Sequence, residues 1–352
     1  MDRLFAPKRL GEGPSSYCQA WRAGSALAVL LAHAVLIYSS DFPPAVGLAA
    51  AASVMAFFVL SGFFIHQSLA ASVERGRPRE YVAARVNRIV PPFLFSILLV
   101  IGLWALAPFV FASGEHSFAE PTARKAFSLT GLYPTLSFLN EFTGPTLSAN
   151  GPLWSLSFEV WYYLLALLAA FAAAKRPAGW IFLPLLLILG WLNPDFLILG
   201  SVWALGFALS VLHSNGRRIQ LSQWPFMIAA LTIGWSYVQS PSDERLLLFD
   251  VSFGLWFAVH LAARLDRAPR IPLLPQAAGF SYTLYVTHFP LLLFTYGAGI
   301  SPFAAVPMAF ALAWIAGPRL ERLQVIRREA AAGTGLGSAP ACWPPRSSGH
   351  CP

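Results

Sequence analysis

Long apolar runs separated by short polar stretches make up most of this chain of 352 residues. An apolar run of about 20 residues can cross the hydrocarbon layer of a bilayer as an α-helix. The pattern predicts ten such helices, with limits near 20–39, 45–68, 91–112, 152–174, 180–192, 196–213, 223–239, 246–262, 276–297 and 302–318. The fifth segment is short, and Asn193-Pro194-Asp195 turns the chain directly into the sixth. The expected fold is an all-α, polytopic membrane bundle of about ten transmembrane helices.

The first segment, WRAGSALAVLLAHAVLIY, contains two ionisable side chains, Arg22 at its start and His33 well inside. They are 11 residues apart, so at about 100° per residue they return to one helix face within about 20°. Their separation along that face is about 16 Å, roughly half the hydrocarbon thickness. Ionisable groups at membrane depth normally face the bundle interior or a water-filled cavity. The two residues therefore predict the ends of a polar passage.

Composition supports the membrane assignment. The chain is 57% hydrophobic and 11% charged, whereas a soluble domain carries about 25% charged residues. The first residues, MDRLFAPKRLGEGPSSYCQ, are polar and basic, and they show no cleavable signal peptide. The net charge of +8 would fit a nucleic-acid-binding protein, but the distribution of the basic residues rejects nucleic acid as a partner.

Lys and Arg follow the positive-inside rule when the N-terminus is placed in the cytoplasm. Of the 24 basic residues, only Arg124, Lys125 and Arg245 then fall outside. This asymmetry predicts ten spans with both termini cytoplasmic. The stretch 113–151 is then the one long external loop, and its length suggests a lid or an acceptor surface.

Three units are expected along the chain. Residues 1–19 form a cytoplasmic segment, 20–320 a transmembrane domain, and 321–352 a cytoplasmic tail with the composition of a disordered region. The spacing of the three cysteines suggests neither a metal site nor a disulfide framework; they are Cys18, Cys342 and Cys351.

The stretch Arg85-Val-Asn-Arg88-Ile-Val-Pro91-Pro92 places two arginines just before the third segment. Their i,i+3 spacing puts both guanidiniums on one helix face. With Arg75, Arg77 and Arg79 they form a cluster able to hold phosphates in a bidentate manner. On charge alone, an ordinary positive-inside anchor that binds lipid headgroups is the better explanation.

Two further ionisable side chains lie inside predicted spans. Glu159 lies about two turns below the outer end of its segment, at the depth of His33, so a Glu159–His33 or Glu159–arginine contact is plausible. His288 lies mid-span, with Tyr285 one turn and Tyr282 almost two turns before it. For both Glu159 and His288, a purely structural hydrogen bond between helices is as good an explanation as a functional role.

Ser61-Gly62 in FFVLSGFF fits a point of close helix packing better than a nucleophile. The remaining histidines lie at span ends or in loops, where solvated or interfacial positions are expected: His66, His116, His213 and His260. No H-E-x-x-H, phosphate loop, G-x-S-x-G or cysteine cluster occurs in the sequence, and no metal site is predicted.

Five motifs, taken in order, resemble acyltransferase family 3, the integral-membrane enzymes that O-acetylate bacterial surface glycans such as O-antigens and nodulation factors. They are R-x10-H at Arg22/His33, FFVLSG at Phe57–Gly62, R-x-x-R-I-x-P at Arg85–Pro91, LWSLSFE at Leu153–Glu159 and SYTLYVTH at Ser281–His288. Members usually carry Ile-Glu-x-Pro near the end of the last common span. This chain reads Ile315-Ala316-Gly317-Pro318 there, without the carboxylate.

The resemblance implies a multi-pass O-acyltransferase of the inner or plasma membrane. It would move an acyl group, expected to be acetyl, from cytoplasmic acyl-CoA to a hydroxyl of a cell-surface glycan or lipid-linked saccharide. Acyl-CoA is a co-substrate, and no permanently bound cofactor is expected. Direct transfer is preferred to an acyl-enzyme, because Ser61 and Ser157 show no sequence sign of activation.

Roles follow from the chemistry of acyl transfer, which needs a base for the hydroxyl and a grip on CoA. The expected site residues are His33 as the base with Glu159 orienting it, Arg22, Arg85 and Arg88 on the CoA phosphates, and Tyr282, Tyr285 and His288 along the acyl or acceptor passage. Two other interpretations stay open at this point. One is a transporter or flippase of a glycan intermediate, because intramembrane His, Glu and Arg also mark substrate pathways. The other is an inactive relative, which the missing carboxylate favours.

Overall fold

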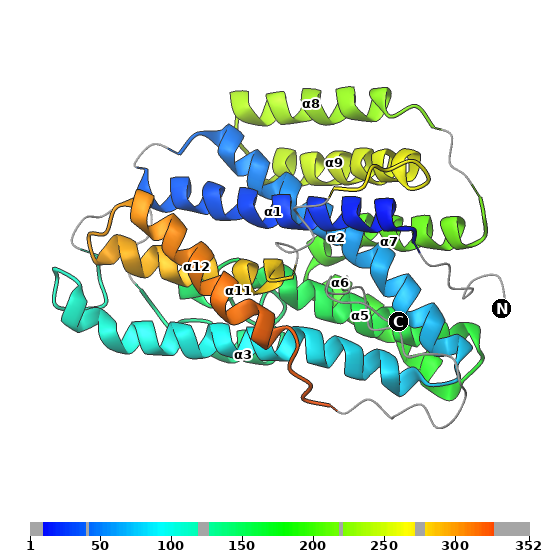
Figure 1. The fold of residues 1–352 in the computed structure, drawn as a ribbon, viewed down its shortest axis with the longest axis horizontal. Helices are drawn as coiled ribbons and strands as arrows, with labels where there is room; N and C mark the ends of the chain where they lie inside the picture. Colours follow the sequence, from blue (N-terminus) through cyan, green and yellow to red (C-terminus); the bar gives the residue numbers. More distant parts are fainter. Residues whose placement is uncertain (1–9, 40–41, 119–126, 218–220, 272–278, 327–352) are drawn as a thin grey trace, which may run out of the picture.

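The computed structural model describes residues 10–39, 42–118, 127–217, 221–271 and 279–326. Helices dominate these residues and run roughly along one direction (Figure 1). They are α1 (Glu12–Tyr38), α2 (Pro44–Glu74), α3 (Pro78–Val110), α4 (Leu132–Leu136), η1 (Ser148–Asn150), α5 (Leu153–Ala173), η2 (Pro177–Ile181), α6 (Phe182–Leu192), α7 (Pro194–Ser214), α8 (Trp224–Gln239), α9 (Asp243–Arg264), α11 (Ser281–Gly297) and α12 (Pro302–Leu320). Each of the ten predicted segments coincides with helical structure, so the all-α prediction is confirmed.

Seven helices are long and apolar enough to cross a membrane, namely α1, α2, α3, α5, α7, α9 and α12. The remaining predicted segments are shorter. α8 has 16 residues, α11 has 17, and the stretch formed by η2 and α6 spans Pro177–Leu192. Ten spans and the cytoplasmic position of the termini therefore stay predictions.

Two helices begin earlier than the hydrophobic pattern indicated. α1 starts at Glu12, within the expected N-terminal segment, and α3 starts at Pro78. Proline is favoured in the first turn of a helix, where its missing N–H has no partner to lose. α3 then continues through Pro91 and Pro92, as transmembrane helices can where neighbours satisfy the freed backbone groups. The arginines before Pro91 therefore lie on the same continuous helix as the apolar span.

α2 is the centre of the bundle, because it packs against α1, α3, α5, α7, α8 and α9. Its contact with α7 is very close. A Cβ atom on Gly62 would lie 2.0 Å from the carbonyl oxygen of Trp203, and one on Gly206 would lie 1.9 Å from that of Val59. Only glycine lets the two backbones approach this closely. The expected close packing at Gly62 is confirmed.

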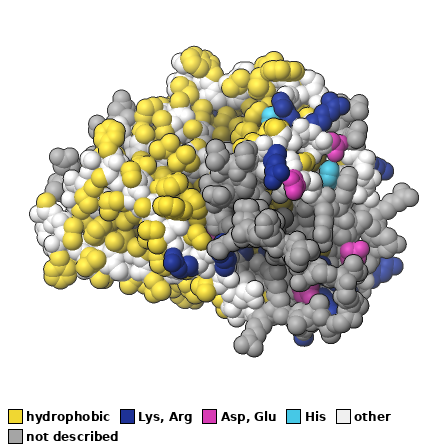
Figure 2. All heavy atoms as spheres, viewed as in Figure 1, with side chains coloured by type: hydrophobic (Ala, Val, Ile, Leu, Met, Phe, Trp, Pro, Cys, Tyr) yellow, Lys and Arg dark blue, Asp and Glu magenta, His cyan; other side chains and the backbone are white. Residues whose placement is uncertain are grey.

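Large apolar side chains cover much of the outer surface, as a lipid-facing protein requires. Phe303, Phe109 and Trp191 are 90%, 86% and 82% exposed. Figure 2 shows apolar side chains over the left part of the molecule, whereas most of the visible charged side chains and the histidines gather towards the end at which α1 begins. The exposed apolar surface fits burial in lipid rather than in water.

The first residues of the predicted tail belong to the bundle. Asn87 of α3 accepts a hydrogen bond from the backbone N–H of Ile326 and donates one to its carbonyl, both at 2.8 Å. The chain thus keeps contact with α3 as far as Ile326, and the boundary at residue 320 stays a prediction. Residues 327–352, with Cys342 and Cys351, lie outside the described residues. Cys18 is buried in α1.

Candidate functional site

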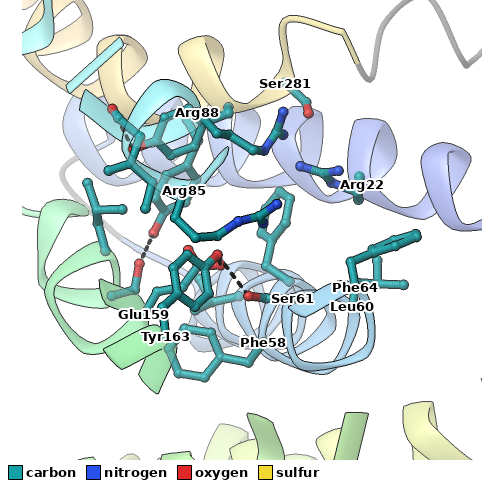
Figure 3. A pocket seen from close by; sticks show the side chains of 17 residues that line it. Arg22, Phe58, Leu60, Ser61, Phe64, Arg85, Arg88, Glu159, Tyr163 and Ser281 are labelled. Carbon is teal, nitrogen blue, oxygen red and sulfur yellow. Dashed lines mark hydrogen bonds between the residues drawn. The ribbon is translucent and has the colours of Figure 1, made fainter. Parts of the chain in front are cut away.

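A cavity of about 80 Å³ lies among α1, α2, α3, α5 and α11 (Figure 3). We call it the arginine cavity. Its lining combines aromatic and aliphatic side chains with charged and hydroxyl-bearing ones, and consists of Arg22, Val54, Phe57, Phe58, Leu60, Ser61, Phe64, Arg85, Arg88, Ile89, Ser155, Leu156, Glu159, Tyr163, Ser281, Tyr282 and Tyr285. All three predicted arginines, Glu159 and both predicted tyrosines are thus brought to one place by four different helices.

The three guanidiniums converge on this cavity. Arg22 reaches in from α1, and Arg85 and Arg88 reach in from neighbouring turns of α3 (Figure 3). Nη2 of Arg85 donates to Oγ of Ser68 at 3.3 Å, but its buried Nε has no hydrogen-bond partner. Nη2 of Arg88 is likewise buried without a partner. Buried N–H donors are rarely left unpaired in native proteins, so these nitrogens mark a place for an acceptor.

Aromatic rings hold both α3 guanidiniums in position. The guanidinium carbon of Arg85 lies 5.9 Å from the ring centres of both Tyr81 and Tyr163. That of Arg88 lies 5.9 Å from the ring centre of Tyr282. Cations are attracted to aromatic faces, and the planar guanidinium suits this contact better than an ammonium. The arrangement is more specific than a topology anchor needs.

A carboxylate supports Arg88 from the other side. Glu321 forms an ion pair with Nη1 of Arg88 at 3.4 Å, and its side chain is only 3% exposed. Its Oε1 accepts hydrogen bonds from both N and Oγ1 of Thr283, each at 3.1 Å. Burial raises the pKa of this carboxyl above its ordinary value, and Arg88 opposes that shift. Glu321, five residues after Ala316, thus places a buried carboxylate beside Arg88.

Glu159 is part of a polar chain on the opposite wall. The hydroxyl of Tyr163 donates to Oε1 of Glu159, and Oγ of Ser61 lies 3.0 Å from the same hydroxyl. Nε1 of Trp203 donates to Oγ of Ser61 at 3.3 Å. Glu159 therefore faces the arginines with Tyr163 as its hydrogen-bond partner. Ser61 lines the cavity, while its neighbour Gly62 makes the packing contact.

His33 instead meets the other mid-span histidine. Nδ1 of His33 lies 2.9 Å from Nε2 of His288, and the two rings stack with centres 5.1 Å apart. Nδ1 of His288 lies 3.0 Å from the carbonyl oxygen of Leu284, so this nitrogen carries the proton and donates it. In a neutral pair, Nε2 of His288 then accepts, and Nδ1 of His33 donates. Nε2 of His33 is left as the basic nitrogen.

The hydrogen-bond partner that the structure shows for Nδ1 of His33 is His288, which the sequence did not predict. A contact between Glu159 and His33 stays a prediction. His33 is half-buried, whereas His288 is fully buried. Neither histidine belongs to the lining of the arginine cavity.

Tyr285 connects the two groups. It lines the arginine cavity, and its ring centre is 6.1 Å from that of His288. Its hydroxyl lies 2.6 Å from Oγ of Ser155 and donates to the carbonyl oxygen of Pro152 at 3.1 Å. Tyr285 therefore lies between the arginine cavity and the histidine pair and contacts both.

Sequence reasoning missed several buried polar contacts. His66 was expected at the end of a span, in a solvated or membrane-interfacial position. It is fully buried instead, with Nδ1 2.8 Å from Oγ of Ser210. Tyr163 follows Glu159 by four residues, so the spacing alone could have predicted that both lie on the same helix face. No signal pointed to Ser210 or Glu321. Among the described residues, no group of three or more His, Cys, Asp and Glu side chains is placed to hold a metal ion.

The fold and these sites define a multi-pass membrane protein with cationic and imidazole side chains gathered inside its helices. The acyltransferase family 3 model, an acyltransferase domain, matches residues 16–317. The chain therefore belongs to this family and is a membrane acyltransferase. No curated protein and no solved structure matched the chain.

Proposed function

We propose that the protein transfers an acyl group, acetyl in the first instance, from acyl-CoA to a hydroxyl of a glycan or lipid-linked saccharide in the bacterial inner membrane. One observation carries this proposal. Three guanidiniums, two of them with an unpaired buried N–H group, surround a cavity that a single tyrosine separates from an oriented histidine. A polyanionic donor and a hydroxyl that must lose a proton need these two elements.

The arginines are proposed to hold the phosphates of CoA. Guanidiniums bind phosphate oxygens in a bidentate manner, and the unpaired nitrogens of Arg85 and Arg88 are available for this. The cavity volume of about 80 Å³ is far below the roughly 300–1,000 Å³ of pockets that enclose whole ligands. A slender acyl–pantetheine arm suits this space better than a nucleotide does. The phosphates would then contact the guanidiniums from the cavity mouth.

The reaction is proposed to be direct. Nε2 of His33 takes the proton from the acceptor hydroxyl while the hydroxyl oxygen attacks the thioester carbonyl carbon. The carbon–sulfur bond breaks, and the proton passes from His33 to the departing thiolate, which gives an ester and free CoA thiol. His288 keeps His33 in the required tautomer. Glu159, with Tyr163, is proposed to act on the donor side, beside the guanidiniums.

The test is release of CoA thiol by the purified protein in the presence of acetyl-CoA and a candidate glycan. Acceptor-dependent thiol release, together with mass gain of the glycan by one acetyl group, is the expected result. Binding or movement of the glycan without thiol release would favour transport. Thiol release without an acceptor that leaves an acetyl group on the protein would favour an acyl-enzyme.

A further inference from the structure

A second and larger cavity lies at the end of the bundle where α5, α7 and α9 begin. Its volume is about 260 Å³, and we call it the acidic pocket. It is lined by Glu141, Trp154, Phe158, Asn193, Asp195, Leu199, Asp243, Leu246, Leu247 and Asp250. Four of these residues are carboxylic acids, and none is basic. An open cavity with this lining favours a positively charged occupant.

Helix dipoles explain only part of this acidity. Asp195 and Asp243 lie in the first turns of α7 and α9, where negative charge is favourable for any helix. Asp250 lies two turns further along α9, is 9% exposed, and has a buried Oδ1 without a hydrogen-bond partner. An unpaired buried carboxylate oxygen is costly. Because Asp250 lines the pocket, a donor bound there would remove this cost.

The loop that carries Glu141 forms part of the wall of this pocket. The backbone of Glu141 is in the left-handed region, with φ of 68°, a conformation that costs about 1 kcal/mol or more for a residue other than glycine. Nδ2 of Asn193 donates to the carbonyl oxygen of Glu141 at 2.9 Å, which ties the loop to the start of α7. Oε1 of Glu141 accepts hydrogen bonds from N and Oγ1 of Thr146. The carboxylate is thereby held at the pocket edge.

We propose that the acidic pocket binds a ligand through an ammonium group. An ammonium offers three N–H donors and one positive charge, which suit dispersed carboxylates. A metal ion would need ligands gathered around one point, and the described residues contain no such group. Trp154 and Phe158 supply an aromatic wall, with their rings arranged edge to face, against which the apolar face of an amino sugar can pack.

The pocket lies on the neighbouring face of the helix that lines the arginine cavity. On α5, Trp154 and Phe158 face the acidic pocket, whereas Ser155 and Glu159 face the arginine cavity. Phe58, which lines the arginine cavity, packs edge-on against Trp154 with ring centres 6.2 Å apart. Under the proposed function, the ligand held by the acidic pocket is the amine-bearing acceptor. That identification rests on the proposed function, but binding itself does not.

The experiment is calorimetric titration of the full-length protein in detergent with glucosamine and with N-acetylglucosamine, at pH 7 and without acyl-CoA. The variants are Asp250→Asn and Asp195→Asn. Glu244→Gln is the matched control, because Glu244 also lies in the first turn of α9 but does not line the pocket. Asp195 is exposed, so its variant also serves if Asp250→Asn fails to fold.

We expect glucosamine to bind the wild type and Glu244→Gln equally. Binding should weaken by about tenfold or more in each Asp variant and for the N-acetylated sugar, since a charged hydrogen bond is lost in each case. Added NaCl should weaken binding as well. The proposal would be overturned if glucosamine did not bind, or if both sugars bound with equal affinity. It would also be overturned if Ca²⁺ displaced glucosamine, or if the folded Asp variants kept the wild-type affinity. Intact binding without acyl transfer would count against the proposed function alone.

Discussion

At the scale of single residues, the histidine pair determines which nitrogen can act as a base. The carbonyl oxygen of Leu284 takes the proton of His288 Nδ1, and the remaining hydrogen bond then leaves Nε2 of His33 basic. Under the proposed mechanism, this order makes His33 the base and His288 the residue that positions it. Exchange of their roles would require the Leu284 carbonyl to face an unprotonated nitrogen, which is unfavourable.

We predict that His33→Ala lowers the rate of acyl transfer by about 10²–10⁴-fold, the usual loss when a general base is removed. Expression, thermal stability and acyl-CoA binding should remain close to those of the wild type. The assay is acceptor-dependent thiol release. His116→Ala is the control, because His116 stacks on Trp104 and lies outside the arginine cavity. Near-wild-type turnover of His33→Ala would remove His33 from the mechanism.

The arginines permit a test that separates phosphate binding from membrane anchoring. In the double variant Arg85→Lys/Arg88→Lys, the positive charge stays but the bidentate fork and the aromatic contacts are lost. We expect acyl-CoA to bind about tenfold or more weakly, as measured by titration with a non-hydrolysable analogue. Arg79→Lys is the control, because Arg79 is exposed on the same helix. Equal affinity in the double variant and the control would return both arginines to the role of topology anchors.

Sequence reasoning succeeded for residues that are neighbours along one helix and failed for partners on different helices. Helical phase placed Arg85 next to Arg88 and Tyr285 next to His288, because both relations are local. The contact between His33 and His288 joins residues 255 positions apart, and no local pattern encodes which helix faces which. Glu321 was missed for a related reason, since it follows the last apolar segment and is buried only by tertiary contacts.

At the scale of helices, the α2–α7 contact limits how the bundle can be packed. Gly62 and Gly206 each place a Cβ position within 2.0 Å of a carbonyl oxygen on the facing helix. Ser61, next to Gly62, lines the arginine cavity, so the glycine contact also positions part of the site. If α7 moved away from α2, Trp203 would move with it, and the hydrogen bond that Trp203 donates to Ser61 would break.

We predict that Gly62→Ala or Gly206→Ala destabilises the fold by about 1–3 kcal/mol, because each added methyl group overlaps backbone that cannot move independently. The measurement is the thermal unfolding midpoint in detergent, followed by tryptophan fluorescence. The control is Gly102→Ala on α3, where an added Cβ meets nothing within 4 Å, and stability should stay the same or rise. A midpoint that falls equally in all three variants would contradict the close-packing explanation.

Helix existence was predictable for the whole bundle, but helix ends were not. Apolar length alone identified ten helical segments, because a lipid-facing helix must be apolar along its span. The starts of α1 and α3 were placed too late, since Glu12 and the arginines of α3 are polar and add nothing to an apolar count. Polar turns at a helix end are stabilised by backbone hydrogen bonds and neighbours, and hydropathy does not register either.

At the scale of the whole molecule, the arginine cavity and the acidic pocket place positive and negative side chains in two separate regions of the protein. The charged side chains that line the first are three arginines and one glutamate, whereas those that line the second are all acidic, and α5 lines both. A polyanionic donor is attracted to one and repelled by the other. The two substrates would therefore approach the histidine pair from different sides of the molecule.

This arrangement leads to a prediction about sidedness. Acyl-CoA is a large polyanion that does not cross a bilayer unaided, so the arginine cavity can receive it only from the aqueous phase nearest to Arg22. Arg22 and His33 are 11 residues apart on α1, or about 16 Å, a distance that an extended acyl–pantetheine arm can span. With the N-terminus in the cytoplasm, the acyl group would advance outward past Tyr285 towards His33.

The measurement uses sealed, oriented vesicles that contain the purified protein. Acyl-CoA supplied only on the face of the N-terminus should support acylation of an acceptor supplied only on the opposite face, and the reverse arrangement should give no product. The reverse arrangement is the control for leakage, because substrates that leak through the bilayer would give product from either side, and vesicles with His33→Ala show the uncatalysed background. Product formed only when both substrates share the N-terminal face would contradict transfer across the membrane. It would leave the protein an acyltransferase whose acceptor reaches His33 from the same side as its donor.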